Sequence, residues 1–171
     1  MQRFACAVLV ALSMVGSLYG QAKTKPVLRV SCTADKRIYA ANDTVDLTVT
    51  LENVGQSDFY IYRNVAWGWA GIGFRLVDAK GDMVQPRQPS ILLPPPPVYD
   101  KSQLVSLARA YFYGTHLAFD LTHYALAPGV YDIEVSYRSN YGEDNSFGLP
   151  ILTFADGSFV SNKVQIEIHS K

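Results

Sequence analysis

Few side chains in this sequence of 171 residues are placed to do chemistry. Cys32 could act as a nucleophile, but it lies on the apolar side of an alternating segment, where we expect a small buried hydrophobe. His116, Asp120 and His123 are residue types that bind zinc. On a strand, positions 116 and 120 share a face and position 123 falls on the other, so we predict no metal site there.

Glu143, Asp144 and Asn145 could offer oxygen atoms to calcium. Three adjacent residues lack the alternating spacing of calcium-binding loops, so we expect a solvated loop tip instead. The sequence contains no Gly-x-Ser-x-Gly, no His-Glu-x-x-His and no phosphate-binding glycine loop. We therefore predict no catalytic residues, no metal and no cofactor, and we expect that the protein is not an enzyme.

Four aromatic residues are the candidate ligand-binding set: Tyr60, Tyr62, Trp67 and Trp69. With glycines between and after them, the two indoles could form a stacking platform for sugar rings or for a partner's side chains. The alternative is that one or both tryptophans fill the core between two sheets. The proline tract of 92–99 is expected to be extended chain that bridges the sheets, or else a segment that docks on an aromatic groove.

The elements that must position these residues are short strands. Alternation of apolar and polar residues with a period of two predicts a strand that is buried on one face and wet on the other. The segments with this pattern are 27–32, 45–52, 59–63, 72–76, 117–121, 131–137 and 164–168. A turn over 53–56 predicts that 59–63 is the antiparallel neighbour of 45–52.

The segment 102–113 has two interpretations. Leu104, Leu107, Ala108 and Tyr111 have helical spacing, whereas the run from Tyr111 to Tyr113 favours a strand. Seven or eight short strands separated by turns predict an all-β protein, an antiparallel immunoglobulin-like β-sandwich, with at most one short helix near 102–110.

One stretch carries a family resemblance. Leu126-x-Pro-Gly-x-Tyr-x-Ile-x-Val-x-Tyr137 resembles the last-but-one strand of exported bacterial immunoglobulin-like domains. Pro128 fixes φ, and Gly129 accepts the positive φ that follows, which makes a turn into the strand. The resemblance implies a structural role for Tyr131, whose hydroxyl would bond to backbone just upstream.

The general pattern is also similar to the bacterial intracellular proteinase-inhibitor domain. The sequence departs from that family by its signal segment, its aromatic 60–75 segment and its proline tract. No functional residue of the inhibitor family can be matched position by position, so the resemblance implies fold rather than activity.

The first 22 residues are predicted to be a secretory signal peptide. Arg3 is followed by an apolar run shorter than the roughly 20 residues of a membrane span, and Ala22 ends a small-residue cleavage site. Cleavage leaves one domain, 23–171, without a membrane span.

Cleavage also removes one base from 15 basic and 15 acidic residues, so the mature net charge is −1. This charge argues against nucleic acid as a partner. Cys32 is then the only cysteine, so no intrachain disulfide can form.

We therefore predict a non-catalytic exported module, periplasmic or extracellular, that binds a protein or a cell-envelope component through its loops. The alternatives are a carbohydrate-binding domain that uses Trp67 and Trp69, and a secreted proteinase inhibitor. A small hydrolase built on His116, Asp120 and His123 is the last alternative.

Overall fold

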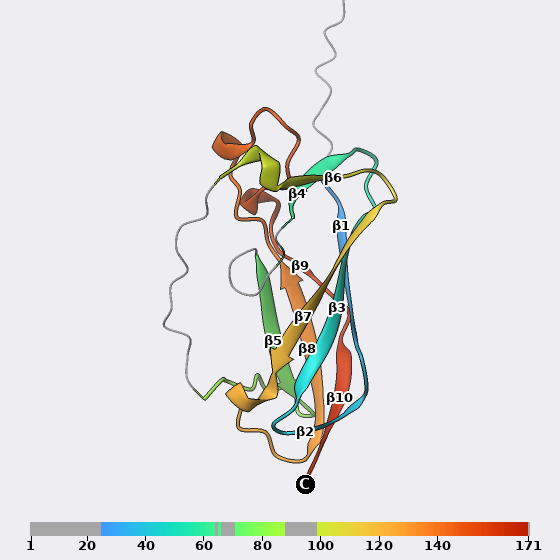
Figure 1. The fold of residues 1–171 in the computed structure, drawn as a ribbon, viewed down its shortest axis with the longest axis vertical. Coiled ribbons are helices and arrows are strands. Elements are labelled where there is room, and N and C mark those ends of the chain that lie inside the picture. The colour runs from blue at the N-terminus through green and yellow to red at the C-terminus, as the bar shows by residue number, and fades with distance from the viewer. Residues whose placement is uncertain (1–24, 64, 66–70, 88–98, 171) are drawn as a thin grey trace, which may run out of the picture.

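The computed structural model describes residues 25–63, 65, 71–87 and 99–170. Two sheets contain most of the strands (Figure 1). The first sheet has the order β1 (Leu28–Ala34), β3 (Thr44–Asn53) and β7 (Phe112–Asp120). The second has the order β2 (Ile38–Ala40), β10 (Val164–His169), β8 (Gly129–Tyr137) and β5 (Ile72–Asp78), and β9 (Phe159–Val160) also pairs with β8. A separate pair joins β4 (Phe59–Tyr62) to β6 (Leu104–Leu107).

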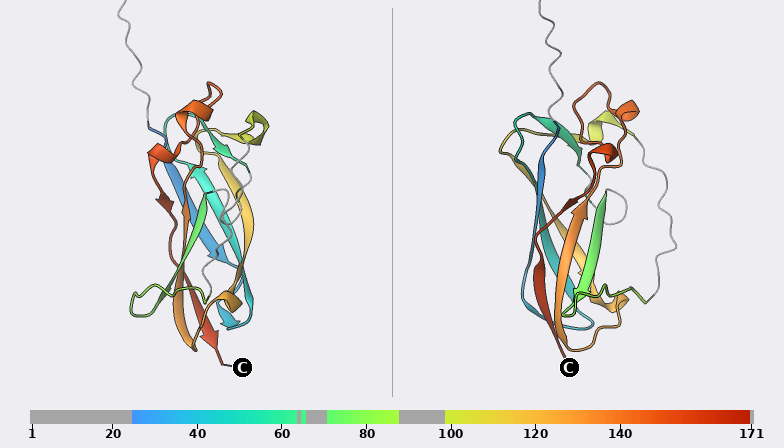
Figure 2. Two further views of the ribbon diagram at one scale, coloured as in Figure 1. Left: turned by 90° about the vertical axis from the view of Figure 1, so that its left-hand side faces the viewer. Right: turned by 180° about the vertical axis from the view of Figure 1, so that it is seen from behind.

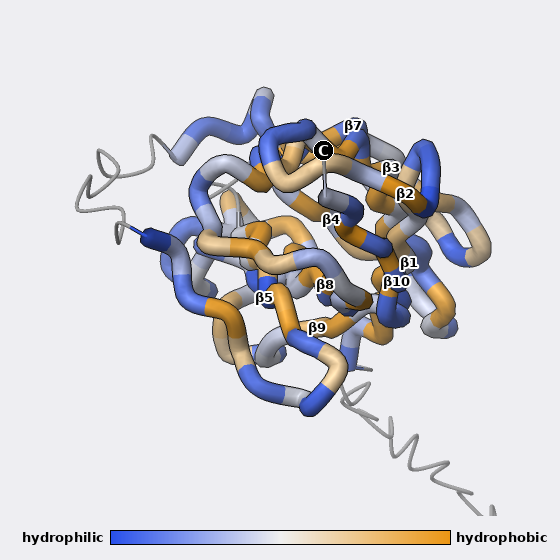
Figure 3. Tube along the Cα trace, turned by 90° about the horizontal axis from the view of Figure 1, so that it is seen from below, coloured by the Kyte–Doolittle hydropathy of each residue, from blue (hydrophilic) through white to orange (hydrophobic). Residues whose placement is uncertain are grey.

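The two sheets face each other as the layers of a sandwich (Figure 3). β1, β3 and β7 correspond to strands A, B and E of an immunoglobulin-like domain, and β5, β8 and β10 correspond to C, F and G. The predicted all-β immunoglobulin-like sandwich is confirmed. The described residues contain ten strands, because the short β2, β4 and β9 also pair, and all pairs of named strands are antiparallel except β2 with β10.

The core lies between the layers and follows the alternation of the sequence. On β3, the side chains of Val45, Leu47, Val49 and Leu51 are completely buried, while the residues between them face outward. The ring of Phe119 on β7 lies 5.2 Å from that of Phe74 on β5, so the rings join the two layers. Burial of the apolar faces is the main stabilising contribution, at about 25 cal/mol per Å² of apolar surface.

The two ends of the sandwich differ (Figure 2). At one end β1, β5 and β7 begin, β3 and β8 end, and β4 and β6 extend the body. Of the four short 3₁₀ turns among the described residues, three also lie there: η1 (Lys101–Gln103), η3 (Glu143–Asn145) and η4 (Phe154–Asp156). We call this the β4–β6 end. β2, η2 (Leu121–His123) and the end of β10 lie at the opposite end.

The predicted pairing of 59–63 with 45–52 is wrong, because β4 pairs with β6 and β3 lies between β1 and β7. Asn53, fully buried at the end of β3, is the physical reason. Its Nδ2 donates to the carbonyls of Ser57 at 3.0 Å and Leu107 at 2.8 Å, and its Oδ1 accepts from Gly55 N at 2.9 Å. These bonds bend the chain out of the sheet, so no hairpin forms.

The helical alternative for 102–110 is also wrong beyond its first turn. Asp100 caps the single turn η1 by accepting a hydrogen bond from Ser102 N at 2.8 Å, and the chain then becomes β6. Residues 104–107 form a strand because they pair with β4, and this pairing outweighs the helical spacing of their apolar side chains. In the described residues, no helix is long and apolar enough to cross a membrane.

Candidate functional site

Cys32 lies in the core of the sandwich, as the sequence predicted, with 1% of its surface exposed. Burial raises the pKa of its thiol to about 11, so the thiolate needed for nucleophilic attack is scarce at neutral pH. The side chain packs as a small hydrophobe on the inner face of β1.

The structure does not bring the two central histidines together. His116 on β7 has its Nδ1 3.2 Å from Thr48 Oγ1, whereas His123 has its Nε2 3.7 Å from Asp120 Oδ2 at the far end of the strand. The pKa of Asp120 is lowered mainly by hydrogen bonds from Thr122. Across the described residues, no group of three or more His, Cys, Asp or Glu side chains could hold a metal ion.

Glu143, Asp144 and Asn145 form the turn η3 at the β4–β6 end. Glu143 and Asp144 are exposed, and Asn145 N donates to the carbonyl of Gly142 at 3.2 Å. The carboxylates extend from a solvated tip, as expected.

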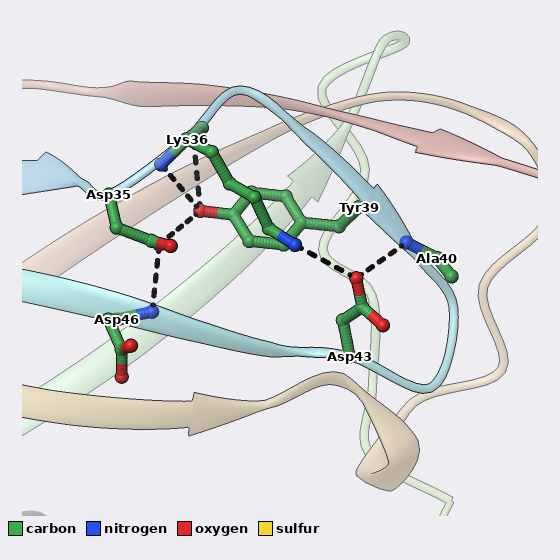
Figure 4. A network of polar contacts seen from close by, with 6 residues as sticks. All are labelled: Asp35, Lys36, Tyr39, Ala40, Asp43 and Asp46. Carbon is green, nitrogen blue, oxygen red and sulfur yellow. Dashed lines mark hydrogen bonds and ion pairs between the residues drawn. The ribbon is translucent and has the colours of Figure 1, made fainter.

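A polar network holds the corner where the chain crosses from the first sheet to the second (Figure 4). The hydroxyl of buried Tyr39 donates to Asp35 Oδ1 at 2.6 Å, and the same oxygen accepts from Asp46 N at 3.1 Å. Lys36 Nζ lies 4.6 Å from the centre of the Tyr39 ring and 3.1 Å from Asp43 Oδ2. The bond from Tyr39 is the main reason that the pKa of Asp35 is lowered, and burial is the main reason that the pKa of Tyr39 is raised. The network ties β1, β2 and β3 together.

Of the four candidate aromatic residues, Tyr60 and Tyr62 are described, and Trp67 and Trp69 lie outside the described residues. Tyr60 and Tyr62 are half-buried on β4. Gly71, which follows the tryptophans, accepts a hydrogen bond from Arg138 N at 2.7 Å just beyond the end of β8. β4 and Gly71, which flank the tryptophans in the sequence, both lie at the β4–β6 end.

Tyr62 belongs to a cluster of three tyrosines that the sequence did not reveal. Tyr141 is 2% exposed, and its ring centre lies 5.6 Å from that of Tyr62 and 5.1 Å from that of Tyr99, the latter edge to face. These distances suit favourable ring pairs. Tyr99 is 40% exposed, so the cluster reaches the surface. The three rings are far apart in sequence, and only the tertiary fold brings them together.

Buried hydroxyl groups lie in this region. The hydroxyls of Tyr137 and Tyr141 are buried, and backbone groups of Tyr62 and Asp100, respectively, lie beside them. Burial raises the pKa of both groups.

The segment after β8 is built onto β4. Tyr60 N donates to Pro150 O and Leu152 N donates to Tyr60 O, each at 2.9 Å. Thr153 and Asp156 then form a reciprocal cap around η4. These contacts fix the segment 149–156 against β4, so the surface of the β4–β6 end is held by backbone hydrogen bonds.

Exposed aromatic residues concentrate at the same end. The large hydrophobic side chains exposed among the described residues include five aromatic ones, Tyr99, Tyr111, Phe112, Phe147 and Phe154. All five belong to segments of the β4–β6 end: the start of η1, the start of β7, and the loop that carries η3 and η4. We call these five residues the aromatic surface. At the opposite end, the exposed large hydrophobics are the aliphatic Ile38, Met83 and Val130.

The opposite end has a shallow depression of about 440 Å³. Its lining includes Arg87, Asn42 and Pro128. The Arg87 Nε donates to Tyr124 O at 3.0 Å, which fixes the segment before the proline tract against η2. Pro128 is the only sequence-predicted site residue in the described lining.

Tyr131 has the structural role that the resemblance implied. Its hydroxyl donates to Ala127 O at 2.9 Å, which closes a tyrosine corner across Pro128 and Gly129. Gly129 has a φ of 155°, outside the range that suits a residue with a side chain.

Comparisons with known proteins do not assign the chain to a family. The chain matches no protein-family model and no curated protein. It is similar to the CARDB domain of the PF1109 protein from Pyrococcus furiosus, crystallised in complex with di-metal ions, with 13% identity, a TM-score of 0.39, and coverage of 85% of this chain and 90% of that one. The solution structure of that CARDB domain is also 13% identical, with a TM-score of 0.38, and the match covers 84% of this chain and 94% of that one. The X-ray structure of the structural-genomics target SoR45 is 13% identical, with a TM-score of 0.34, and the match covers 86% of this chain and 92% of that one. Similarity this low carries no argument about ligands or metal ions.

Proposed function

We propose that this protein is an exported, non-catalytic binding module that recognises a protein or another cell-envelope component through the aromatic surface. The observation that carries the proposal is the placement of all five exposed aromatic side chains of the described residues at one end of the sandwich. Aromatic side chains supply large contact areas and dominate binding energy at interfaces. Large exposed aromatic side chains that share one end of a domain make that end the candidate interaction site.

Two further observations support binding over catalysis. The one thiol of the described residues is buried and its pKa is raised to about 11. The histidines lie apart, and the bonded network around Asp35 and Tyr39 holds strands together.

A carbohydrate ligand is the second candidate, and the tyrosine cluster favours it. The rings of Tyr62 and Tyr99 pack tilted and edge-on against the buried ring of Tyr141, and the cluster reaches the surface at Tyr99. Sugar rings pack against such aromatic faces, and hydroxyl groups of tyrosine can meet those of a sugar. The participation of Trp67 and Trp69 stays a prediction, as does the proteinase-inhibitor alternative.

A pair of matched double variants tests the proposal. Tyr99→Ser with Phe154→Ser removes two rings of the aromatic surface, and Ile38→Ser with Met83→Ser removes two exposed apolar side chains at the opposite end. Each protein is measured by surface plasmon resonance against immobilised envelope fractions and on a polysaccharide array. We expect the first variant to bind at least about tenfold more weakly and the second to bind like the wild type.

Equal binding by both variants, or equal loss in both, would overturn the assignment of the aromatic surface. Binding confined to envelope proteins supports the first candidate. Binding to polysaccharides that Tyr99→Ser abolishes supports the second.

A further inference from the structure

We propose that two copies of this protein associate through the outer edge of β7, with their β7 strands antiparallel about a two-fold axis at His116. The two first sheets then become one continuous sheet.

β7 is an edge strand. It pairs with β3 in nine unbroken register steps from Thr44 with Asp120 to Glu52 with Phe112, and within the described residues it has no strand on its other side. A long edge without a bulge presents a row of backbone donors and acceptors that another strand can use.

The direction of those groups follows from bonds at both ends of the strand. Asn53 N donates to Tyr111 O, and Leu121 N donates to Asp43 O, so the odd-numbered residues between these two, 113 to 119, turn their N–H and C=O groups toward β3. In an antiparallel pair the direction alternates from residue to residue. The N–H and C=O groups of Phe112, Gly114, His116 and Ala118 therefore point to the open edge.

The edges at β1, at β2 and along the second half of β5 have protection that β7 lacks. The amide of Asn162 covers β1, accepting from Cys32 N and donating to Cys32 O, both at 2.9 Å. β2 is only three residues long, and Val84 N donates to Leu76 O beside the second half of β5. The stretch 112–119, in contrast, has no charged residue and no proline. Charges, prolines and short length are the usual protection against edge pairing.

The side chains fit a second copy of the same strand. With His116 opposite itself, Gly114 lies opposite Ala118 and Phe112 lies opposite Asp120. No like-charged carboxylates or ammonium groups then meet, and the small Gly114 and Ala118 leave room beside the imidazoles. The ring of Phe112, 70% exposed in one copy, gains a diagonal neighbour in Ala118 of the other copy.

A disulfide test reads the register directly. Hydrogen-bonded partners in antiparallel strands have Cα atoms about 5.5 Å apart, a separation that a disulfide spans. We expect His116→Cys in the mature chain to form a covalent dimer on oxidation. Thr50→Cys, on the neighbouring β3, is the matched control, because three strand spacings would separate its two copies by at least roughly 14 Å. Formation of dimer by both variants, or by neither, would overturn the register.

Sedimentation equilibrium tests the association itself. We expect the wild type to be a dimer at micromolar concentration, and Ala118→Pro to raise the dissociation constant at least about tenfold, because proline removes an outward N–H without touching a β3 bond. Circular dichroism checks that the variant folds, and Ala118→Lys replaces it if it does not. A monomeric wild type, or a dimer that neither variant weakens, would refute the proposal. Tyr99→Ser with Phe154→Ser should leave the dimer intact, so this test is separate from that of the aromatic surface.

Discussion

Asn53 shows how one side chain can set the path of the chain. Its fully buried amide uses both its donors and its acceptor to hold Ser57, Leu107 and Gly55. Removing the amide takes away the buried bonds to the carbonyl of Leu107 and the N–H of Gly55, and each lost bond costs about 1–3 kcal/mol. We expect Asn53→Ala to lower the free energy of unfolding by about 3 kcal/mol, measured by urea denaturation.

Asn42→Ala is the matched control for that prediction, since Asn42 is exposed in a turn. We expect its unfolding free energy to stay within about 0.5 kcal/mol of the wild type. Equal stability of the two variants would show that the bonds of Asn53 do not hold the bend.

The hydrogen bond between Tyr39 and Asp35 predicts a pH dependence. The pKa of Asp35 is lowered in the folded protein, chiefly by this bond, so the stabilisation is complete above the ordinary pKa of an aspartate, about 3.9, and is lost as the pH falls through the lowered value. We expect Tyr39→Phe to cost about 1–2 kcal/mol at pH 7 and progressively less below pH 4, by urea denaturation at several pH values. Tyr111→Phe, on a 68% exposed ring, is the control. A difference between wild type and Tyr39→Phe that grows on acidification would contradict the argument.

At the scale of elements, the sequence predicted strands well and their partners poorly. β1, β3, β8 and β10 follow the alternation because each buries one face, a local pattern. The pairing of β4 with β6 depends on residues some 45 positions apart and on the buried amide of Asn53. β2 could not be foreseen either, because its three residues gain their place only by lying parallel to β10.

The features of the candidate site likewise divide into those that local sequence predicts and those that depend on the tertiary fold. The burial of Cys32 and the bond of Tyr131 follow from local pattern and turn chemistry. The tyrosine cluster joins Tyr62, Tyr99 and Tyr141, which come from three separate segments, so no spacing in the sequence could signal it. The exposure of Tyr111 and Phe112 was equally hidden, since aromatic residues are expected in the core.

The side chain of Asn162 joins β1 to the segment before β10, two parts of the chain that are not paired as strands. Its amide holds both backbone groups of Cys32 and so connects the segment before β10 to the edge of β1. We expect Asn162→Ala to open this edge, lower stability by about 1–2 kcal/mol and speed labelling of the Cys32 thiol by a disulfide reagent under native conditions. Lys163→Ala, one residue away, should label at the wild-type rate. Unchanged labelling in Asn162→Ala would mean that the edge is held by other contacts.

At the scale of the whole molecule, the domain must be stable without covalent links if the export prediction is right. Removal of the first 22 residues takes Cys6 with it and leaves Cys32 as the only cysteine, buried in the core with a raised pKa. We expect the exported protein to begin at Lys23, by mass spectrometry of the intact chain. We also expect its thermal unfolding midpoint to be the same with and without a reducing agent, because apolar burial and hydrogen bonds, neither of which a reducing agent affects, hold the layers together. The precursor kept in the cytoplasm, which retains Cys6, is the comparison. A midpoint of the exported form that falls on reduction would show that Cys32 leaves the core to join a second chain, and it would contradict the buried position on which this argument depends.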